Sequence, residues 1–274
     1  MTIDLHVHTT ASDGLLRPAD IVARALDLEL RVISITDHDS VAGIDEACEA
    51  AAGTTLEVIP GVELSVHATG GGDAHILGYF VDQHDDALLV ALSRLQTARF
   101  DRAVAMVDAL RTAGHAISLD DVLGYADGGA VGRVHVARAL VAARSVDTIE
   151  EAFAELIGRD GPFYVRKALF LPRAALDAIH GAGGVAVLAH PGVSGEGPLV
   201  GLVAEGLDGI EAYHADHTRP QRDHFVSVAR RFGLIVTGGS DFHGPGLRSA
   251  SLGSGSCPPE VVEALRERAT ILRP

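Results

Sequence analysis

The sequence has no tryptophan, and aromatic residues make up only 4% of its 274 residues. That is poor material for the surface on which single-strand-binding proteins stack unpaired bases. Basic residues are also scarce, because 22 lysines and arginines face 37 aspartates and glutamates, for a formal charge of -15. Such a balance argues against a long nucleic-acid duplex or an anionic membrane as the main partner. An anionic substrate therefore needs a local positive site, such as bound metal ions.

Cysteines and long apolar runs are equally scarce. Cys48 and Cys257 alone cannot form a disulfide framework, and no apolar run is long enough to span a bilayer. The first expected strand begins within a few residues of Met1, which leaves no room for a signal peptide. We therefore expect a cytoplasmic protein with no membrane partner, whose 47% hydrophobic residues are enough for a sizeable core.

The N-terminal stretch DLHVHTTASDG, residues 4–14, has a pattern suited to metal binding. On a β-strand successive side chains point to opposite faces, so His6 and His8 share one face while Leu5 and Val7 share the other. Two imidazoles one pleat apart can bind a single ion, and the turn after them can add the carboxylate of Asp13. An isolated H-x-H is at least as often an ordinary polar strand face, so the rest of the chain decides.

The remainder of the chain alternates between strand and helix patterns, except in one block. Apolar strand segments are expected near 3–7, 32–36, 56–60, 185–189, 209–213 and 234–237, with a hairpin over 64–81. From 85 to 163 only helical patterns occur, including a long helix with apolar residues from Leu88 to Leu110 and a helix expected to begin at Arg133. We interpret this block as a helical insertion between the strands of a β/α barrel.

Polar residues lie at or just past the C-terminal ends of the apolar strands. They are His6 and His8, Asp37 and His38, Glu63, His190, and Asp241 and His243. In a β/α barrel those ends converge on one rim, the face that carries the active site. A single polar residue at a strand end is more often an ordinary loop residue, but polar residues at the ends of several successive strands make coincidence a poor explanation.

Longer motifs point to a known family. The matching pieces are DLHVHTTASDG, ITDHDSVAGI, VIPGVELS, HILGYF, VGRVHVARAL, GGVAVLAHPG, DGIEAYHADH and GGSDFHG. With these pieces the sequence resembles the polymerase-and-histidinol-phosphatase (PHP) superfamily of metal-dependent phosphoesterases. The G-R-x-H-x-A-R-A-L element and the insertion look most like its nucleotide phosphoesterase branch, which includes the RNase AM type. Val134 departs from that element, where we expect proline.

The resemblance implies both a fold and a substrate class. The expected fold is α/β, a distorted seven-stranded TIM-like barrel formed by residues 1–84 and 164–274, with an inserted small helical domain at 85–163. The expected substrates are 3′,5′-bisphosphonucleotides, nucleoside monophosphates and the 5′ ends of short 5′-phosphorylated RNA, with inorganic phosphate as product.

The resemblance also implies a site for three divalent metal ions. In it, His6, His8, Glu63 and Asp241 bind the first ion, Glu63 bridges to a second ion that His75 and His190 complete, and Asp13, His38 and His243 hold the third. Imidazole and carboxylate ligands without thiolates suit Mn²⁺, the expected cofactor, with Fe²⁺ and Zn²⁺ as alternatives. A hydroxide that bridges a close metal pair would then attack phosphorus.

Other polar residues are assigned to substrate or left open. The resemblance implies that Arg133 and His135 contact the substrate and take part in catalysis, Arg133 as a phosphate clamp and His135 as a contact or proton donor. His217 is a further candidate for substrate binding, for which an ordinary polar loop is an equal alternative. Asp37 and Glu211 suit hydrogen bonding to ligand imidazoles at least as well as direct ligation. The roles of Arg99, Arg102, Lys167 and His214 stay open.

Three alternatives compete with a nucleotide phosphoesterase. A histidinol-phosphate-type phosphatase lies within the same superfamily. An amidohydrolase or deaminase also begins with H-x-H and ends with a strand-end aspartate, but it usually needs a metal-bridging lysine on a middle strand, where this chain has Glu63 and no lysine near it. A degenerate barrel that only senses nucleotides should have lost ligands, and every expected ligand is present.

Overall fold

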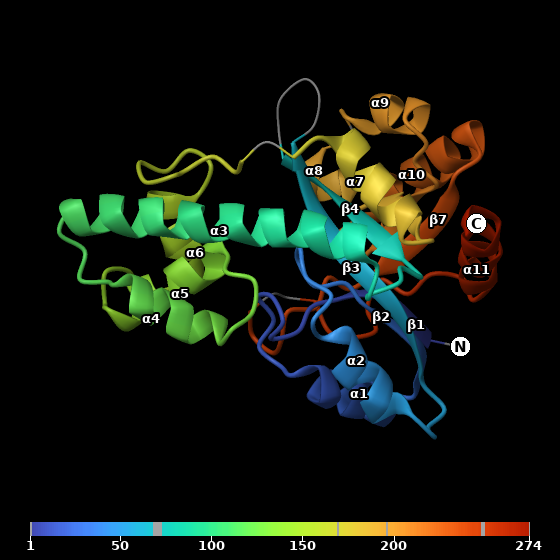
Figure 1. Ribbon diagram of the computed structural model, residues 1–274, viewed down its shortest axis with the longest axis horizontal. Coiled ribbons are helices and arrows are strands. Elements are labelled where there is room, and N and C mark those ends of the chain that lie inside the picture. The colour runs from blue at the N-terminus through green and yellow to red at the C-terminus, as the bar shows by residue number, and fades with distance from the viewer. Residues whose placement is uncertain (1, 68–72, 169, 196, 248–249, 274) are drawn as a thin grey trace. The chain divides into compact units, whose positions relative to one another are not determined.

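The computed structural model describes residues 2–67, 73–168, 170–195, 197–247 and 250–273. The chain divides into two compact units (Figure 1). A barrel unit comprises residues 1–92 and 169–274, and a helical unit comprises residues 93–168. Helix α3 (Asp86–Thr112) belongs to both, because its first residues lie in the barrel unit and the rest in the helical unit.

A seven-stranded sheet forms the barrel unit, with its strands in chain order. They are β1 (Thr2–Val7), β2 (Leu30–Ile35), β3 (Glu57–His67), β4 (Asp73–Tyr79), β5 (Val185–Leu188), β6 (Gly209–His214) and β7 (Ile235–Gly239). β4 is antiparallel to β3 and β5, and the other neighbouring strands are parallel. A parallel bridge joins Val7 to Phe242 beyond β7, so the sheet nearly closes. The expected seven-stranded distorted barrel is confirmed.

The third strand differs from the expectation. Segments 56–60 and 64–69 were expected to be separate, but β3 is a single strand of 11 residues. It pairs parallel with β2 as far as Pro60 and antiparallel with β4 from Gly61 onward. Proline has no N–H to donate to a neighbouring strand. A Cβ on Gly61 would lie 2.5 Å from Ser34 Oγ, so the chain approaches β2 closely there. Pro60 and Gly61 therefore suit the point at which β3 changes its pairing strand from β2 to β4. The turn of the expected hairpin, residues 70–73, lies outside the described residues except for Asp73, which is the first residue of β4.

The barrel unit also contains helices, most of which pack against its strands. They are α1 (Pro18–Asp27), α2 (Ile44–Ala51), α7 (Pro172–Gly181), α8 (Pro191–Ser194), α9 (Leu199–Ala204), α10 (Arg219–Phe232) and α11 (Glu260–Leu272). α1 and α2 pack together beside β2 and β3, α7 lies beside β3, β4 and β5, and α10 lies beside β6 and β7. One core cluster joins β1 and β2 to α1 and α2, and another joins β1 and β5 to α11.

Both faces of β1 are buried, including the face with polar side chains. Asp4, His6 and His8 are all fully buried. A buried carboxylate needs hydrogen-bond donors, and Asp4 accepts from the backbone N–H of Ser240 at 2.9 Å, from its hydroxyl at 2.6 Å and from Gly253 N–H at 2.7 Å. Asp4 therefore connects the first strand to the segment after the last, where the barrel closes.

The helical unit contains helices and no strand among its described residues. Besides most of α3 it comprises α4 (Leu119–Ala126), α5 (Arg133–Ala142), α6 (Ile149–Glu151) and the π-helix η1 (Ala152–Ile157). The apolar face expected along the long helix is buried, and its residues Met106 and Leu110 belong to the core cluster of the helical unit. Arg133 is the first residue of α5, which confirms the predicted helix start, and Val134 fits its second position.

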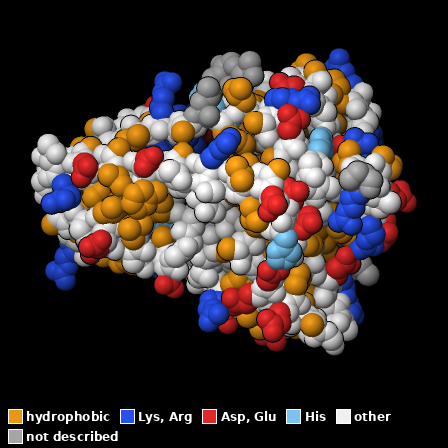
Figure 2. All heavy atoms as spheres, viewed as in Figure 1, with side chains coloured by type: hydrophobic (Ala, Val, Ile, Leu, Met, Phe, Trp, Pro, Cys, Tyr) orange, Lys and Arg blue, Asp and Glu red, His pale blue; other side chains and the backbone are white. Residues whose placement is uncertain are grey.

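No helix in the described part of the chain is both long and apolar enough to cross a bilayer. On the face drawn in Figure 2, lysine and arginine side chains are interspersed with acidic ones and form no continuous basic surface. That face offers no footprint of the kind a nucleic-acid duplex needs.

Candidate metal centre

Four side chains around the end of β1 have donor atoms close to the ring nitrogens of His6 and His8. Nε2 of His6 lies 3.1 Å from Nε2 of His8, and both lie within 3.4 Å of Oδ1 of Asp241. Oε2 of Glu63 is 3.5 Å from His6 Nε2 and 3.3 Å from His8 Nε2. This first group contains the ligands predicted for the first ion.

Glu63 belongs to a second group through its other oxygen. Its Oε1 lies 2.8 Å from Nδ1 of His75 and 3.0 Å from Nε2 of His190. His75 reaches the same edge as the ends of the parallel strands because β4 is antiparallel, and Ala189 N–H, just past β5, donates to the His75 carbonyl at 3.0 Å. The fully buried Glu63 therefore faces both groups, as the predicted bridge between two ions requires.

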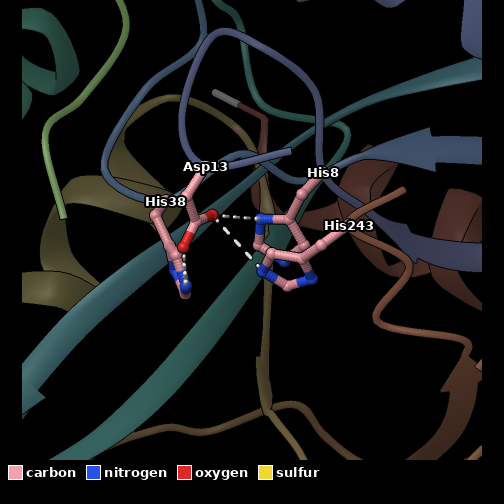
Figure 3. A group of neighbouring side chains, drawn as sticks. All are labelled: His8, Asp13, His38 and His243. Carbon is pink, nitrogen blue, oxygen red and sulfur yellow. Dashed lines mark ion pairs between the residues drawn. The ribbon is translucent and has the colours of Figure 1, made fainter. Parts of the chain in front are cut away.

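A third group surrounds Asp13, whose carboxylate lies between His38 and the rings of His8 and His243 (Figure 3). Asp13 Oδ1 is 3.3 Å from His243 Nε2 and 3.8 Å from His8 Nδ1, and its Oδ2 is 4.0 Å from His38 Nε2. His38 also faces Glu63, with 2.8 Å between its Nδ1 and Oε2. The ring of His38 thus lies between the third group and Glu63, whereas the prediction placed it in the third group alone.

The three groups suit metal ions by their donor types, and the first group also does so by its spacing. Donor atoms at about 2.0–2.2 Å from one ion are separated by roughly 2.8–3.6 Å between neighbouring ligands in tetrahedral or octahedral arrangements. The first group matches this range with separations of 3.1–3.5 Å. Among the described residues, His8 Nδ1 is a buried atom without a hydrogen-bond partner, and His38 Nδ1 and Glu63 Oε2, although 2.8 Å apart, do not form a hydrogen bond of good geometry. Such atoms suit ligation, because a buried polar atom needs some partner.

Electrostatics in the cluster favour a bound cation. Burial alone lowers the pKa of His6, but the carboxylates of Glu211, Asp241 and Glu63 raise it well above 6.5. Burial also lowers the pKa of His8, but hydrogen bonds with Asp241 and Glu63 raise it to about 9. Burial raises the pKa of Glu63, yet the surrounding imidazoles lower it well below 4.5. The carboxylates are therefore anionic. In the metal-free protein, protons on the imidazoles supply the positive charge that divalent ions supply when they bind.

Asp37 holds the loop that carries Asp13. Its carboxylate accepts the N–H and the hydroxyl of Thr9, each at 2.7 Å, and the hydroxyl of Ser12 at 2.5 Å. Gly14 closes the loop, since a Cβ there would lie 2.6 Å from the carbonyl oxygen of His8. Asp37 lies in none of the donor groups found among the described residues, so its contacts favour the hydrogen-bonding role.

Glu211 orients two of the predicted ligands. Its Oε1 accepts from His6 Nδ1 at 3.0 Å, and its Oε2 accepts the backbone N–H of His190 at 2.8 Å. A proton on His6 Nδ1 leaves the lone pair of Nε2 directed at the first group, as an outer carboxylate does for a ligand histidine. Burial raises the pKa of Glu211, but His6 and its neighbours lower it to about 2, so Glu211 stays anionic.

The helical unit has a cavity of its own with three arginines. The cavity opens to solvent and is lined by Arg99, Arg102, Ala103, Met106, Val131, Gly132, Arg133 and Val136. The guanidinium of Arg102 lies 5.3 Å from the ring centre of Tyr164, and its Nε donates to the Val165 carbonyl at 2.6 Å. Three guanidinium groups around one apolar-floored cavity are suited to an anion.

Arg133 and His135 take defined conformations at the start of α5. The guanidinium of Arg133 lies 5.3 Å from the ring centre of Phe153 and 5.5 Å from that of Tyr164, and donates to the Ile157 carbonyl at 3.4 Å. His135 is buried and its Nδ1 accepts the N–H of Gly132 at 2.9 Å. An N–H can only donate, so a neutral His135 ring has its proton on Nε2. The contact of both residues with substrate stays a prediction.

His214, the last residue of β6, and His217, which follows it, differ in what they face. Nε2 of His214 lies 3.6 Å from Oδ2 of Asp241, next to the first group. His217 donates from Nδ1 to the Ala212 carbonyl at 2.9 Å and accepts the Gly192 N–H at Nε2 at 3.0 Å. Both ring nitrogens of His217 are thus bonded to backbone, and its contact with substrate stays a prediction.

Comparisons with known proteins agree with this geometry. A model of the PHP domain matches residues 4–161. The chain is 34% identical over 281 positions to a 3′,5′-nucleoside bisphosphate phosphatase of Chromobacterium violaceum, covering 99% of this chain and 98% of the relative. The chain belongs to the PHP family. This PHP protein is also 37% identical over 248 positions to a 5′-3′ exoribonuclease of Haemophilus influenzae, covering 88% of this chain and 90% of that one.

A solved structure shows the same fold over nearly the whole chain. A protein of Bifidobacterium adolescentis, assigned as a metal-dependent phosphoesterase, superposes with a TM-score of 0.90 at 33% identity, covering 97% of this chain and 96% of that one. The predicted family is therefore confirmed. With these relatives and the donor groups described above, this PHP protein is a hydrolytic enzyme, a metal-dependent phosphoesterase.

Proposed function

We propose that this PHP protein removes phosphate from small nucleotides, in particular 3′,5′-bisphosphonucleotides and nucleoside monophosphates, and acts on the 5′ ends of short RNA. The observation that supports phosphate-ester chemistry best is the placement of Glu63, whose two oxygens face two different imidazole groups. The names of the relatives, a nucleoside bisphosphate phosphatase and an exoribonuclease, support the substrate class.

Three divalent ions complete the proposed site. His6, His8, Glu63 and Asp241 hold the first, Glu63, His75 and His190 the second, and Asp13, His38 and His243 the third. Mn²⁺ is the proposed cofactor, with Fe²⁺ or Zn²⁺ as alternatives, because the donors are imidazoles and carboxylates. When bound, such ions supply Lewis acidity toward the phosphoryl oxygens and lower the pKa of water. The protein residues orient the ligands, through Glu211 and Asp37, and bind the substrate.

The arginine cavity of the helical unit is the proposed binding site for a phosphate that is not cleaved. Arg133 presents a planar guanidinium held by two aromatic rings, and such a group can bind two phosphate oxygens at once. Arg99 and Arg102 line the same cavity and add positive charge to it. His135 has its proton on Nε2, which suits a hydrogen bond to substrate or proton donation to a leaving oxygen.

A phosphate-release screen tests the proposal. Protein reconstituted with Mn²⁺ is offered 3′,5′-bisphosphonucleotides, mononucleotides, histidinol phosphate and short 5′-phosphorylated RNA. We expect inorganic phosphate from the nucleotides and little from histidinol phosphate, with more than one metal ion per chain by elemental analysis. Preference for histidinol phosphate would reassign the protein to the alternative within the superfamily. Full activity after exhaustive chelation, verified by metal analysis, would rule out the metal chemistry.

A further inference from the structure

His190 depends on its neighbours for its conformation. It lies two residues past the end of β5, with φ 29° and ψ 55°, in a region that side chains rarely adopt. A residue in so sparsely populated a region costs roughly 1–3 kcal/mol and persists only where the surrounding structure holds it. Because His190 Nε2 lies 3.0 Å from Glu63 Oε1, the placement of this donor depends on what fixes the turn 190–192.

Besides Glu211, which accepts the His190 N–H at 2.8 Å, two side chains from outside that turn hold its backbone. Gly192 N–H donates to Nε2 of His217 at 3.0 Å, and the Gln221 side-chain amide donates to the Gly192 carbonyl at 3.1 Å. The packing is close, since a Cβ on Gly192 would lie 2.6 Å from Cδ2 of His217 and 2.9 Å from Nε2 of Gln221. Both polar backbone groups of Gly192 are therefore bound by side chains from the segment that follows β6.

These two side chains are themselves fixed. His217 donates from Nδ1 to the Ala212 carbonyl at 2.9 Å, and because a carbonyl only accepts and an N–H only donates, the ring is neutral with its proton on Nδ1. Gln221 accepts the Thr218 N–H at its Oε1 at 2.9 Å, which caps the start of α10. The turn of His190 is thus connected to β6 through one side chain and to α10 through the other.

We infer that His217 and Gln221 are positioning residues that hold the turn of His190 in place for the second metal group. Neither touches the expected ion, and both act through the backbone of Gly192. The inference rests on the proposed function, which assigns His190, Glu63 and His75 to that ion. Outer contacts of metal ligands typically change metal affinity by about 10–100-fold when they are lost.

Two substitutions of His217 separate this role from general support of the fold. Glutamine places an oxygen near Nε2 and so keeps the acceptor for Gly192 N–H, while asparagine places its amide near Nδ1 and keeps only the donor to Ala212. Each variant loses one hydrogen bond of the ring, so their effects on stability should be similar. Metal-depleted proteins are titrated with Mn²⁺ in competition with a chromophoric chelator, and the melting temperature of each metal-free protein is measured.

Reference variants identify the binding step concerned. His190→Ala removes the ligand itself, so the Mn²⁺-binding step that it weakens in the titration is the step that belongs to the second group. Thr218→Ala weakens the cap of α10 but leaves the bond between Gln221 and Gly192, whereas Gln221→Ala removes both. Any loss of Mn²⁺ affinity in Gln221→Ala beyond that in Thr218→Ala therefore belongs to the turn.

The expected result is that His217→Asn weakens the step lost in His190→Ala by about 10–100-fold, while His217→Gln stays within a few fold of wild type. Equal affinities in wild type, His217→Asn and His217→Gln would overturn the inference. Equal losses in both variants, in proportion to their melting temperatures, would show a structural role and overturn it too. A wild-type protein that binds fewer than two ions would instead refute the metal assignment of the proposed function.

Discussion

Asp37 accepts two hydrogen bonds from Thr9, one from the backbone N–H and one from the hydroxyl, both at 2.7 Å. This pair ties the end of β2 to the loop that places Asp13. We predict that Asp37→Asn destabilises the metal-free protein by roughly 1–3 kcal/mol. The side-chain NH₂ group of asparagine is a hydrogen-bond donor, and it would face the buried donors of Thr9 and Ser12, which need an acceptor. The substitution should also weaken Mn²⁺ binding by the third group.

Urea unfolding and Mn²⁺ titration measure these two effects of Asp37→Asn. Asp27→Asn is the control, since Asp27 is exposed at the end of α1 and an exposed substitution should change stability by less than about 0.5 kcal/mol. If the two variants unfold at the same urea concentration, Asp37 does not hold the loop.

Glu63→Gln should be more damaging than the loss of any ligand from one group alone. The carboxylate faces the first group through one oxygen and the second through the other, and its charge offsets the repulsion between two ions. We expect Mn²⁺ affinity in both groups to fall by more than the about 10–100-fold typical of a lost outer contact, with most turnover lost. His75→Ala, which removes a ligand of the second group only, is the comparison. Wild-type kcat in Glu63→Gln at saturating Mn²⁺ would exclude Glu63 from the site.

The metal-free protein should lose stability as pH rises from about 6.5 to 9. The pKa of His8 is raised from 6.5 to about 9 in the fold, so its stabilising contribution is complete below 6.5 and disappears as pH rises through about 9. Mn²⁺ affinity should rise over the same interval, because the ligands must lose protons to bind. Melting curves of chelated protein at several pH values measure the first effect. His8→Gln should flatten the dependence, and His84→Gln, at an exposed site, should leave it unchanged. A flat profile in the chelated wild type would contradict the prediction.

Much of the metal centre could be predicted because strand periodicity and strand ends are local properties of the sequence. All nine predicted ligands lie in groups of facing donor atoms, which a single rim of converging strands explains. For Asp37 and Glu211 the sequence left hydrogen bonding to ligand imidazoles and direct ligation both open. Glu211 accepts a hydrogen bond from His6 and also lies in a donor group with His6 and His214, whereas Asp37 accepts its hydrogen bonds from Thr9 and Ser12. The seven strands were also predicted, except that Pro60 and Gly61 were taken to end a strand within which the pairing partner changes.

What the sequence could not reveal depends on contacts between distant segments. His38 faces Glu63 through one nitrogen and Asp13 through the other, a placement that no spacing in the sequence encodes. Gln221 was missed altogether, although Thr218 and Gln221 form a capping box whose pattern predicts the start of α10. Its second contact, with the carbonyl of Gly192, depends on the packing of α10 beside β6 and could not be read from the sequence.

Arg133 offers the sharpest test of the nucleotide assignment. Its guanidinium lines the cavity of the helical unit and is held over Phe153 and Tyr164. If it clamps a phosphate remote from the bond that is cleaved, Arg133→Ala should lower kcat/KM for a 3′,5′-bisphosphonucleotide by about 10–100-fold, as the loss of a hydrogen bond to a charged group predicts. A minimal aryl phosphate has no second phosphate, so its hydrolysis should change little.

Kinetics on both substrates, with melting temperatures measured in parallel, separate the roles that Arg133 can have. Arg133→Lys should recover only part of the loss, because an ammonium cannot bind two phosphate oxygens in the fixed geometry of a guanidinium. Arg138→Ala is the matched control, since Arg138 lies on the same helix and its guanidinium is 4.4 Å from the ring centre of Tyr125. A parallel fall of kcat on both substrates would place Arg133 at the reacting phosphoryl group instead. Unchanged kcat/KM on both would make it a structural residue, and the nucleotide assignment would then lose its main support from the helical unit.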